Sequence, residues 1–240
     1  MHVSQTALLA LGVFAMLAFS FAGSGCNNFT PPDPAQVPDA ELGEDVATQN
    51  ANTDAHTDAP QTRQAILAGG CFWCVEAVYE MLDGVSDAES GYIGGTAETA
   101  NYPTVCSKTT DHAEAVRITY DPAKITFEQL LKVFFTTAHN PTQLNRQGND
   151  YGPQYRSAIF PLNDEQADIA RAYIDQLNAT PEYDGRIVTT IEPGHTFYPA
   201  ETNHQDFARN NPDHGYIRGV SQPKVEHTRE AFEELLRDGE

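Results

Sequence analysis

The sequence has few basic residues and few cysteines. Its 240 residues include 14 Lys and Arg against 34 Asp and Glu, which gives a formal net charge of −20. This acidic balance argues against binding to nucleic acid and against electrostatic adhesion to an anionic membrane. Only four cysteines are present, and none follows Cys106. Any thiol chemistry therefore depends on cysteines in the first half of the chain.

Long apolar runs are also scarce, and the one at the N-terminus covers only residues 7–22. It has the length of a signal peptide and is too short for a transmembrane helix. Gly23-Ser24-Gly25-Cys26 follows and looks like a bacterial lipoprotein processing site, although Gly23 replaces the expected aliphatic residue and no Lys or Arg precedes Arg63. We expect a signal peptide over 1–25, lipidation at Cys26, and an exported protein on the periplasmic or outer-surface side, held to the membrane only by its lipid. Ordinary cleavage between residues 22 and 25, with a free Cys26, is the alternative.

The next stretch, residues 26–62, contains five prolines among Asn, Thr, Ala and acidic residues, with few large apolar side chains. Such a segment cannot bury a core, so we expect a disordered acidic, Pro-rich linker. Residues 63–240 are long enough for a single domain with a sizeable core. We expect a single, monomeric domain over these residues.

The most informative run is Gly69-Gly70-Cys71-Phe72-Trp73-Cys74, which follows the apolar stretch 65–68. Apolar residues at helical spacing over 72–82 predict a helix, so Cys71 should stand at its start. Free N–H groups and the helix dipole favour the thiolate there, and we expect the pKa of Cys71 to fall toward neutrality. Cys74 would lie one turn further on the same face, close enough for a disulfide. The pattern predicts a nucleophile with its own resolving partner.

The remaining periodicity mixes strands and helices without regular parallel crossovers. Strands are expected around 90–93, 115–120, 156–160 and 187–192, and helices over 127–138, 164–177 and 226–238. The loop 140–154, rich in Gly, Asn and Gln, is expected to line the site. This pattern predicts an α+β fold, a two-layer α/β sandwich with a mixed sheet.

Four ordered blocks identify a family resemblance. They are Gly-Cys-Phe-Trp at 70–73, Asn-Tyr-Pro at 101–103, the run 111–122, and the run 146–157. Together they resemble the A-type peptide methionine sulfoxide reductases over residues 63–225. The resemblance implies a ferredoxin-like core, reduction of methionine-S-sulfoxide in oxidised proteins or as the free amino acid, and no bound cofactor or metal.

The resemblance also implies roles for individual residues. Cys71 would attack the sulfoxide sulfur, while Glu114 would serve as acid or hydrogen-bond donor to the oxygen, assisted by Tyr102 and Tyr155. Phe72 and Trp73 would form an apolar wall for the S-methyl group, with Asp150 in the polar wall. Asn203 and Phe207 stand where the family usually has tyrosine. A hydroxyl function at these two positions is therefore not expected.

Attack would leave a sulfenic acid on Cys71, which a second thiol must resolve. Cys74 is favoured, and Cys106 is the alternative. An external thioredoxin-like dithiol would then reopen the disulfide. Two other interpretations remain open from the sequence. One is a general dithiol-disulfide oxidoreductase that uses Cys71 and Cys74, and the other is a zinc site that adds Cys106 and His112 to that pair.

Overall fold

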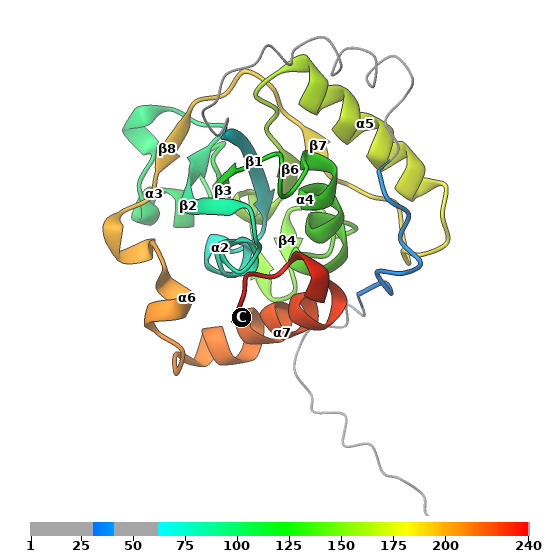
Figure 1. Ribbon diagram of the computed structural model, residues 1–240. Coiled ribbons are helices and arrows are strands. Elements are labelled where there is room, and N and C mark those ends of the chain that lie inside the picture. The colour runs from blue at the N-terminus through cyan, green and yellow to red at the C-terminus, as the bar shows by residue number, and fades with distance from the viewer. Residues whose placement is uncertain (1–30, 41–61, 240) are drawn as a thin grey trace, which may run out of the picture.

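The computed structural model describes residues 31–40 and 62–239. Its helices and strands follow one another along the chain as Figure 1 shows. They are β1 (Arg63–Gly69), α2 (Phe72–Glu80), β2 (Val85–Ile93), α3 (Tyr102–Cys106), β3 (Ala113–Tyr120), α4 (Phe127–Val133), β4 (Arg146–Gln147), β5 (Asp150–Tyr151), β6 (Ser157–Ile159), α5 (Asp164–Asn178), β7 (Thr190–Ile191), β8 (Phe197–Pro199), α6 (Phe207–Asn210) and α7 (Gln222–Ala231).

Six of the strands form one mixed sheet in the order β7-β6-β1-β3-β2-β8. Strand β1 is antiparallel to β3 and β6, whereas β6 and β7 are parallel. In the β1–β3 ladder Leu67 pairs with Val116, and in the β2–β3 ladder Tyr92 pairs with Glu114. The C-terminal end of β1 therefore lies beside the first residues of β3, where Glu114 stands.

The sheet carries most of its core on the face covered by α2, α4 and α5 (Figure 1). Side chains alternate between the two faces of a strand, so Leu67 and Val116 pack under the helices while Ile66 and Ala115 belong to a smaller cluster on the opposite face. Glu114 precedes Val116 by two residues and faces α2 as well. The expected α+β fold with a mixed sheet is confirmed.

Two elements near the C-terminal end differ from the sequence expectation. The strand expected over 187–192 is limited to β7, residues Thr190–Ile191. The helix expected over 226–238 is α7 and spans Gln222–Ala231, with Pro223 in its first turn. A π-helical turn over Ile217–Ser221 runs directly into α7, so Pro223 follows a local irregularity in a continuous helical run. Helix α7 ends before Phe232, whose side chain is buried in the main core.

The segment 31–40 contradicts part of the predicted linker. Val37 is buried in the main core, and the carbonyl of Pro38 accepts a hydrogen bond from the Tyr173 hydroxyl on α5 at 2.9 Å. Lys132 on α4 binds Asp39 at 2.6 Å. Composition favoured disorder over 26–62, but one buried valine and these tertiary contacts hold residues 31–40 on the domain.

The predicted signal sequence and Cys26 lie outside the described residues. Within residues 31–40 and 62–239, no helix combines the length and apolar character that crossing a membrane requires.

Candidate active site

Cys71 occupies the turn between β1 and α2. Gly70 has φ +93°, a left-handed conformation that glycine adopts without strain. A Cβ on Gly70 would stand 2.4 Å from Cγ of Gln147. Cys71 itself is the N-cap residue of α2, and only 8% of it is exposed. The two-glycine turn thus brings the thiol to the helix start, as predicted, but in a buried position.

We expect Gly70→Ala to destabilise the protein by about 2–4 kcal/mol, because alanine adds backbone strain and overpacks the site at once. The Gln147 side chain cannot move away freely, since its amide bonds both the N–H and the carbonyl of Asn140. Urea unfolding would measure this loss. Gly194→Ala is the matched control, because its φ is also positive at +81° but nothing lies within 4 Å of the added Cβ. Equal losses in the two variants would contradict the packing argument.

Glu114 reaches the start of α2 from β3. One carboxyl oxygen, Oε2, accepts a hydrogen bond from the backbone N–H of Phe72 at 3.1 Å, and the residue is 1% exposed. Burial raises the pKa of Glu114 to about 8. The side chain is therefore mostly neutral at pH 7 and retains a proton that it can donate. Nucleophile and acid are adjacent because Phe72, the partner of Glu114, directly follows Cys71.

Cys71 and Cys74 form a hydrogen-bonded pair of thiols. Burial raises the pKa of Cys71 well above its usual value, and the neighbouring Cys74 and Glu114 add to the rise. The hydrogen bond from Cys71 lowers the pKa of Cys74 to about 7, helped by the charge of Lys224. The expected fall in the pKa of Cys71 is therefore wrong for the substrate-free protein, because burial outweighs the effect of the helix terminus.

Tyr216 is a site residue that sequence reasoning missed. Its hydroxyl lies 3.9 Å from Sγ of Cys74 and donates a hydrogen bond to Oδ2 of Asp150 at 2.5 Å. Asp150 belongs to the short strand β5, so the loop 140–154 does line the site as expected. Tyr216 comes from the segment between α6 and α7, which carries no periodic signal. Only the packing of that segment against α2 brings its hydroxyl to the thiols.

Tyr102 and Tyr155 both lie close to the reacting groups. Burial raises the pKa of each phenol, and the charges of Glu114 and Cys71 raise it further. Both hydroxyls therefore keep their protons across the physiological pH range. Tyr102 stands in the first turn of α3, where the Asn101 side chain accepts a hydrogen bond from the backbone N–H of Thr104. The structure brings both predicted tyrosines to the site.

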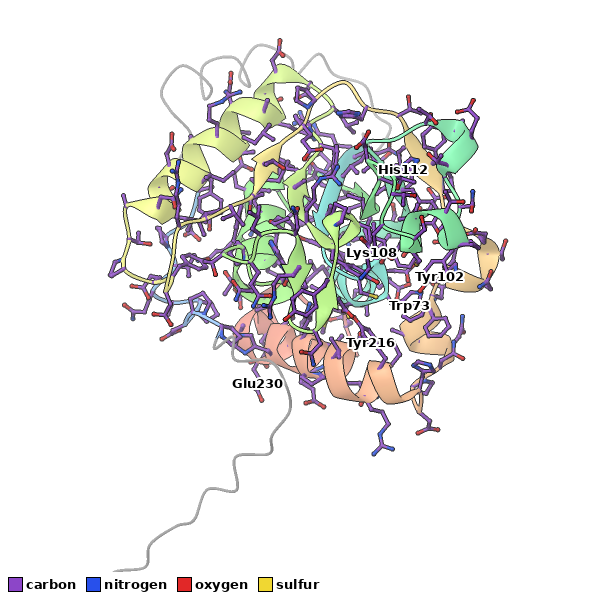
Figure 2. All side chains as sticks on the ribbon, turned by 180° about the vertical axis from the view of Figure 1, so that it is seen from behind. Trp73, Tyr102, Lys108, His112, Tyr216 and Glu230 are labelled. Carbon is purple, nitrogen blue, oxygen red and sulfur yellow. The ribbon has the colours of Figure 1, made fainter. Side chains whose placement is uncertain are left out.

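An aromatic wall surrounds Trp73. The Phe207 ring stacks on its indole at a centroid distance of 3.8 Å and an angle of 12°. Tyr216 meets the indole edge-on at 6.0 Å, and His204 stacks at 5.7 Å. Figure 2 shows Trp73, Tyr102 and Tyr216 on the same side of the molecule. Phe72 is 1% exposed and lies behind this wall, so Trp73 presents the more accessible surface.

Cys106 and His112 are bonded to groups other than the thiol pair. The thiol of Cys106 is hydrogen-bonded to Tyr102, one turn earlier on α3. His112 is fully buried, with Nδ1 facing the N–H of Gly95 at 3.3 Å and Nε2 facing the carbonyl of Thr96 at 3.0 Å. Its ring nitrogens are therefore engaged by the backbone. Within the described part of the chain, no three His, Cys, Asp or Glu side chains are placed to hold a metal ion.

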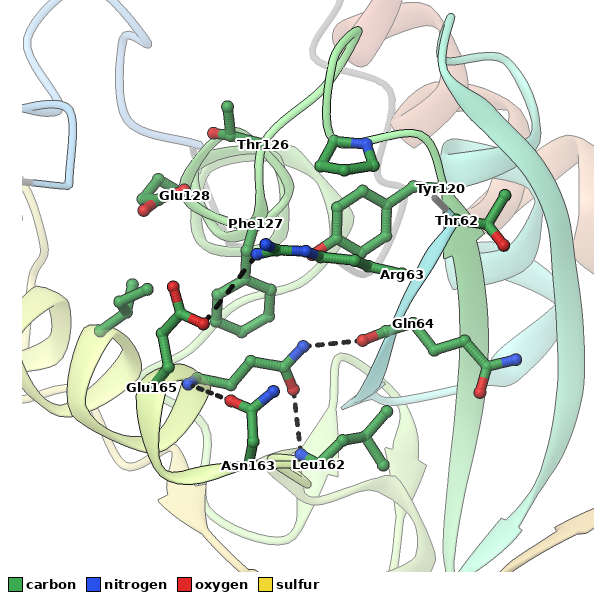
Figure 3. Close-up of a pocket in the computed structure, with 13 residues that line it drawn as sticks. Thr62, Arg63, Gln64, Tyr120, Thr126, Phe127, Glu128, Leu162, Asn163 and Glu165 are labelled. Atoms are coloured by element: carbon green, nitrogen blue, oxygen red, sulfur yellow. Dashed lines mark hydrogen bonds and ion pairs between the residues drawn. The ribbon is translucent and has the colours of Figure 1, made fainter. Parts of the chain in front are cut away.

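One large cavity lies at the other end of β1 from Cys71. It measures about 830 Å³ and is bordered by Arg63, Tyr120, Phe127 and Glu165, with no thiol in its lining (Figure 3). A cavity of about 550 Å³ has no cysteine in its lining either, but Asp150, Tyr216 and Lys224, which act on the Cys74 thiol, contribute to its wall. Size alone therefore does not identify the reactive centre.

Comparisons with known proteins agree with this site. Residues 63–236 match the family model described as "Peptide methionine sulfoxide reductase". The chain is 50% identical over 202 residues to "Peptide methionine sulfoxide reductase MsrA" of Deinococcus radiodurans, which covers 82% of this chain and 98% of that protein. It is 54% identical over 178 residues to "Peptide methionine sulfoxide reductase MsrA 1" of Rhodopirellula baltica, covering 74% and 91% respectively.

Two solved structures are also similar. The reduced form of Mxr1 from Saccharomyces cerevisiae has a TM-score of 0.58 and 33% identity, covering 70% of this chain and 95% of that one. The methionine sulfoxide reductase A of Corynebacterium diphtheriae has a TM-score of 0.55 and 34% identity, covering 65% and 77%. The chain therefore belongs to the peptide methionine sulfoxide reductases of the A type, and its reaction is the reduction of methionine-S-sulfoxide.

Proposed function

We propose that Cys71 is the nucleophile of this reaction. Its Sγ attacks the sulfoxide sulfur while Glu114 gives a proton to the oxygen. The oxygen then passes from that sulfur to Sγ, so that the S–O bond and the transient S–S bond both break, and Cys71 is left as a sulfenic acid while methionine is released. The proton lost by the Cys71 thiol replaces the one that Glu114 gave. The observation that carries this proposal is the hydrogen bond between Glu114 and the N–H of Phe72. It places a buried proton donor directly beside the residue that bears the thiol.

Glu114, Tyr102 and Tyr155 receive the sulfoxide oxygen in this proposal. A sulfoxide oxygen is basic, and it gains negative charge as the sulfur is attacked. A neutral Glu114 can transfer a proton to it, and two protonated phenols can donate hydrogen bonds without reorganisation. The raised pKa values of all three groups support this assignment.

The aromatic wall is proposed to hold the S-methyl group of the substrate. Trp73 offers an indole that Phe207 and His204 fix by stacking. A thioether or sulfoxide sulfur near such a ring gains a modest favourable contact. Phe207 supports the indole without needing the hydroxyl that the family usually has there. Phe72 backs the wall, and Asp150 orients Tyr216.

Cys74 is proposed to resolve the sulfenic acid. Its thiol attacks Sγ of Cys71, the Cys71–Cys74 disulfide forms, and water leaves. Two observations support Cys74 over Cys106. Cys74 already contacts Cys71 and has a pKa near 7, whereas Cys106 is paired with Tyr102 and burial raises its pKa. The charge of Lys224 and the Tyr216 hydroxyl both favour the Cys74 thiolate.

A thioredoxin-like protein is proposed to reopen the disulfide. Exchange needs a further thiol to attack the disulfide. The thiol of Cys106 is hydrogen-bonded to Tyr102 and burial raises its pKa, and no cysteine follows it, so an external dithiol is proposed as the reductant. Oxidised proteins with exposed methionine sulfoxide are the proposed substrates, together with the free amino acid.

The function is tested by supplying the two sulfoxide diastereomers of an N-acetylmethionine amide separately, with a small dithiol as reductant. The S form should be consumed and the R form left untouched. Reduction of insulin disulfides by a protein that ignores both sulfoxides would instead establish the general oxidoreductase.

The thiol pair predicts a specific pH titration. Thiolate absorbance at 240 nm should show one group with a midpoint near pH 7, since the pKa of Cys74 is lowered to about 7. Cys71→Ala removes the largest cause of that lowering, so the midpoint should move toward the ordinary cysteine value of about 8.5. An unchanged midpoint in Cys71→Ala would contradict the pairing.

The finer fold assignment and the export route are also proposals. A ferredoxin-like core is supported by the central order β6-β1-β3-β2, with α2 and α4 as the two crossovers. Lipidation at Cys26 predicts that the full chain partitions into the membrane fraction, and that Cys26→Ser appears in the soluble exported fraction. Identical partitioning of the two proteins would contradict lipidation.

A further inference from the structure

The segment 200–207 forms one side of the aromatic wall, and three side chains hold it in place. Glu201 accepts hydrogen bonds from the Tyr92 hydroxyl at 2.8 Å and from the N–H of Tyr102 at 2.9 Å. Gln205 bonds both the N–H and the carbonyl of Ser90 on β2. The third contact comes from Glu76, which belongs to α2, the helix that carries Cys74 and Trp73.

Glu76 bonds the segment 200–207 at Asp206, a residue with a left-handed backbone conformation. Its Oε1 accepts a hydrogen bond from the backbone N–H of Asp206 at 3.1 Å. Asp206 has φ +52° and ψ 26°, a left-handed conformation that residues other than glycine seldom adopt. Such a conformation persists only where surrounding contacts hold it. The next residue is Phe207, whose ring stacks on Trp73.

Glu76 is an unusual residue for this position. It is 1% exposed in the middle of α2, and its second oxygen, Oε2, is buried without a hydrogen-bond partner among the described residues. Burying a carboxyl is costly unless its polar atoms are satisfied. The reaction steps above make no use of it. A costly buried group whose carboxyl accepts a hydrogen bond from the backbone of the residue before Phe207 indicates a role in the position of that segment.

We propose that Glu76 is a positioning residue for substrate binding: its carboxyl holds Asp206 in the left-handed conformation and so fixes Phe207 and His204 against Trp73. The proposal rests on the proposed function, because the wall that it fixes is the one assigned to the S-methyl group. Glu76 does not touch the reacting atoms. Its loss should weaken substrate binding more than the chemical step.

The first test compares Glu76→Ala with Glu76→Gln. Glutamine keeps an oxygen acceptor for the N–H of Asp206, whereas alanine removes it. Glu76→Ala should raise KM for the S-sulfoxide about tenfold, the effect of one lost buried hydrogen bond, and change kcat less than about threefold. Glu76→Gln should restore a KM within about threefold of the parent. Equal losses in the two variants, or a parental KM in Glu76→Ala, would overturn the proposal.

Trp73 provides a readout that does not depend on activity, because it is the only tryptophan of the chain. Loosening of Phe207 and His204 in Glu76→Ala should shift the fluorescence emission to longer wavelength and increase quenching by acrylamide. Glu76→Gln should keep the parental spectrum. A parental spectrum in Glu76→Ala overturns the positioning role even where activity falls. If the parent protein failed to reduce the S-sulfoxide but Glu76→Ala still showed the expected spectral shifts, the result would contradict the proposed function and leave the positioning role standing.

A second-site variant tests the conformation of Asp206 directly. Glycine adopts the left-handed conformation without cost, so Asp206→Gly should recover part of the KM and the emission spectrum in the Glu76→Ala background. Asp206→Ala is the matched control: it removes the same ion pair with Arg209 but keeps the strain. Equal recovery by glycine and alanine would show that the charge of Asp206, and not its conformation, is the quantity that Glu76 controls.

The pH dependence gives a further check. Burial raises the pKa of Glu76 to about 8, and the groups facing it are Glu80 on α2, Asp206 on the segment, and the Ser90 hydroxyl on β2. Ionisation above pH 8 adds a charge beside Glu80 and Asp206, so KM should rise there. Glu76→Gln should remove that rise. A rise that persists unchanged in Glu76→Gln would contradict the positioning role.

Discussion

Replacing Cys71 by serine is expected to lower single-turnover formation of methionine by at least about 10⁴-fold, the scale seen when an essential nucleophile is removed. A hydroxyl is a poor nucleophile toward sulfur. Cys74 keeps its thiol in this variant, but that thiol lies one turn into α2 and not at the helix start. The measurement is methionine released from one equivalent of S-sulfoxide, in the absence of reductant.

Cys74→Ser is the matched control for this result. Cys74 acts only after methionine has left, so the variant should release one equivalent of methionine and then stop when a protein dithiol is the reductant. It should accumulate a sulfenic acid on Cys71 that a dimedone-type reagent traps. If Cys71→Ser retained the first turnover while Cys74→Ser lost it, the assignment of nucleophile and resolver would be reversed.

Glu114→Gln should lower kcat/KM by about 10²–10³-fold, the usual contribution of a general acid. Glutamine can still donate a hydrogen bond to the sulfoxide oxygen, but it cannot transfer a proton. Because burial raises the pKa of Glu114 to about 8, the acidic form is present below that pH and is lost above it. The parent kcat should therefore fall about tenfold per pH unit on the alkaline side, and Glu114→Gln should lack that limb in kcat.

Glu226→Gln on the exposed side of α7 is the control for removing a carboxylate. It should keep both the rate and the alkaline limb of the parent. A Glu114→Gln variant with the full parental rate would show that a hydrogen bond suffices and that Glu114 does not transfer a proton.

The sequence was informative where the relevant spacing is local. Cys71 and Cys74 share a helix turn, so their contact follows from spacing alone. Side chains alternate between the two faces of a strand, so a strand assigned over 113–120 also places Glu114 on the same face as Val116. The position of Glu114 beside Phe72 depends on the β1–β3 register, which a single sequence leaves undetermined. Here the resemblance supplied what periodicity could not.

Three features depended on tertiary packing and were not predictable from the pattern. Tyr216 reaches Cys74 only because the segment after α6 folds against α2. The pKa of Cys71 rises because the site is buried, a property that helix position alone does not reveal. Residues 31–40 pack on the domain through Val37 and Asp39 although their composition favours disorder. In each case long-range contacts outweighed the local signal.

The most direct test of the account is the disulfide that forms after one turnover. The full chain, reduced and freed of dithiol, receives one equivalent of the S-sulfoxide, and the disulfide is mapped by mass spectrometry of its peptides. The account predicts a Cys71–Cys74 link with Cys106 still reduced. A Cys71–Cys106 link, or a disulfide that excludes Cys71, would contradict it.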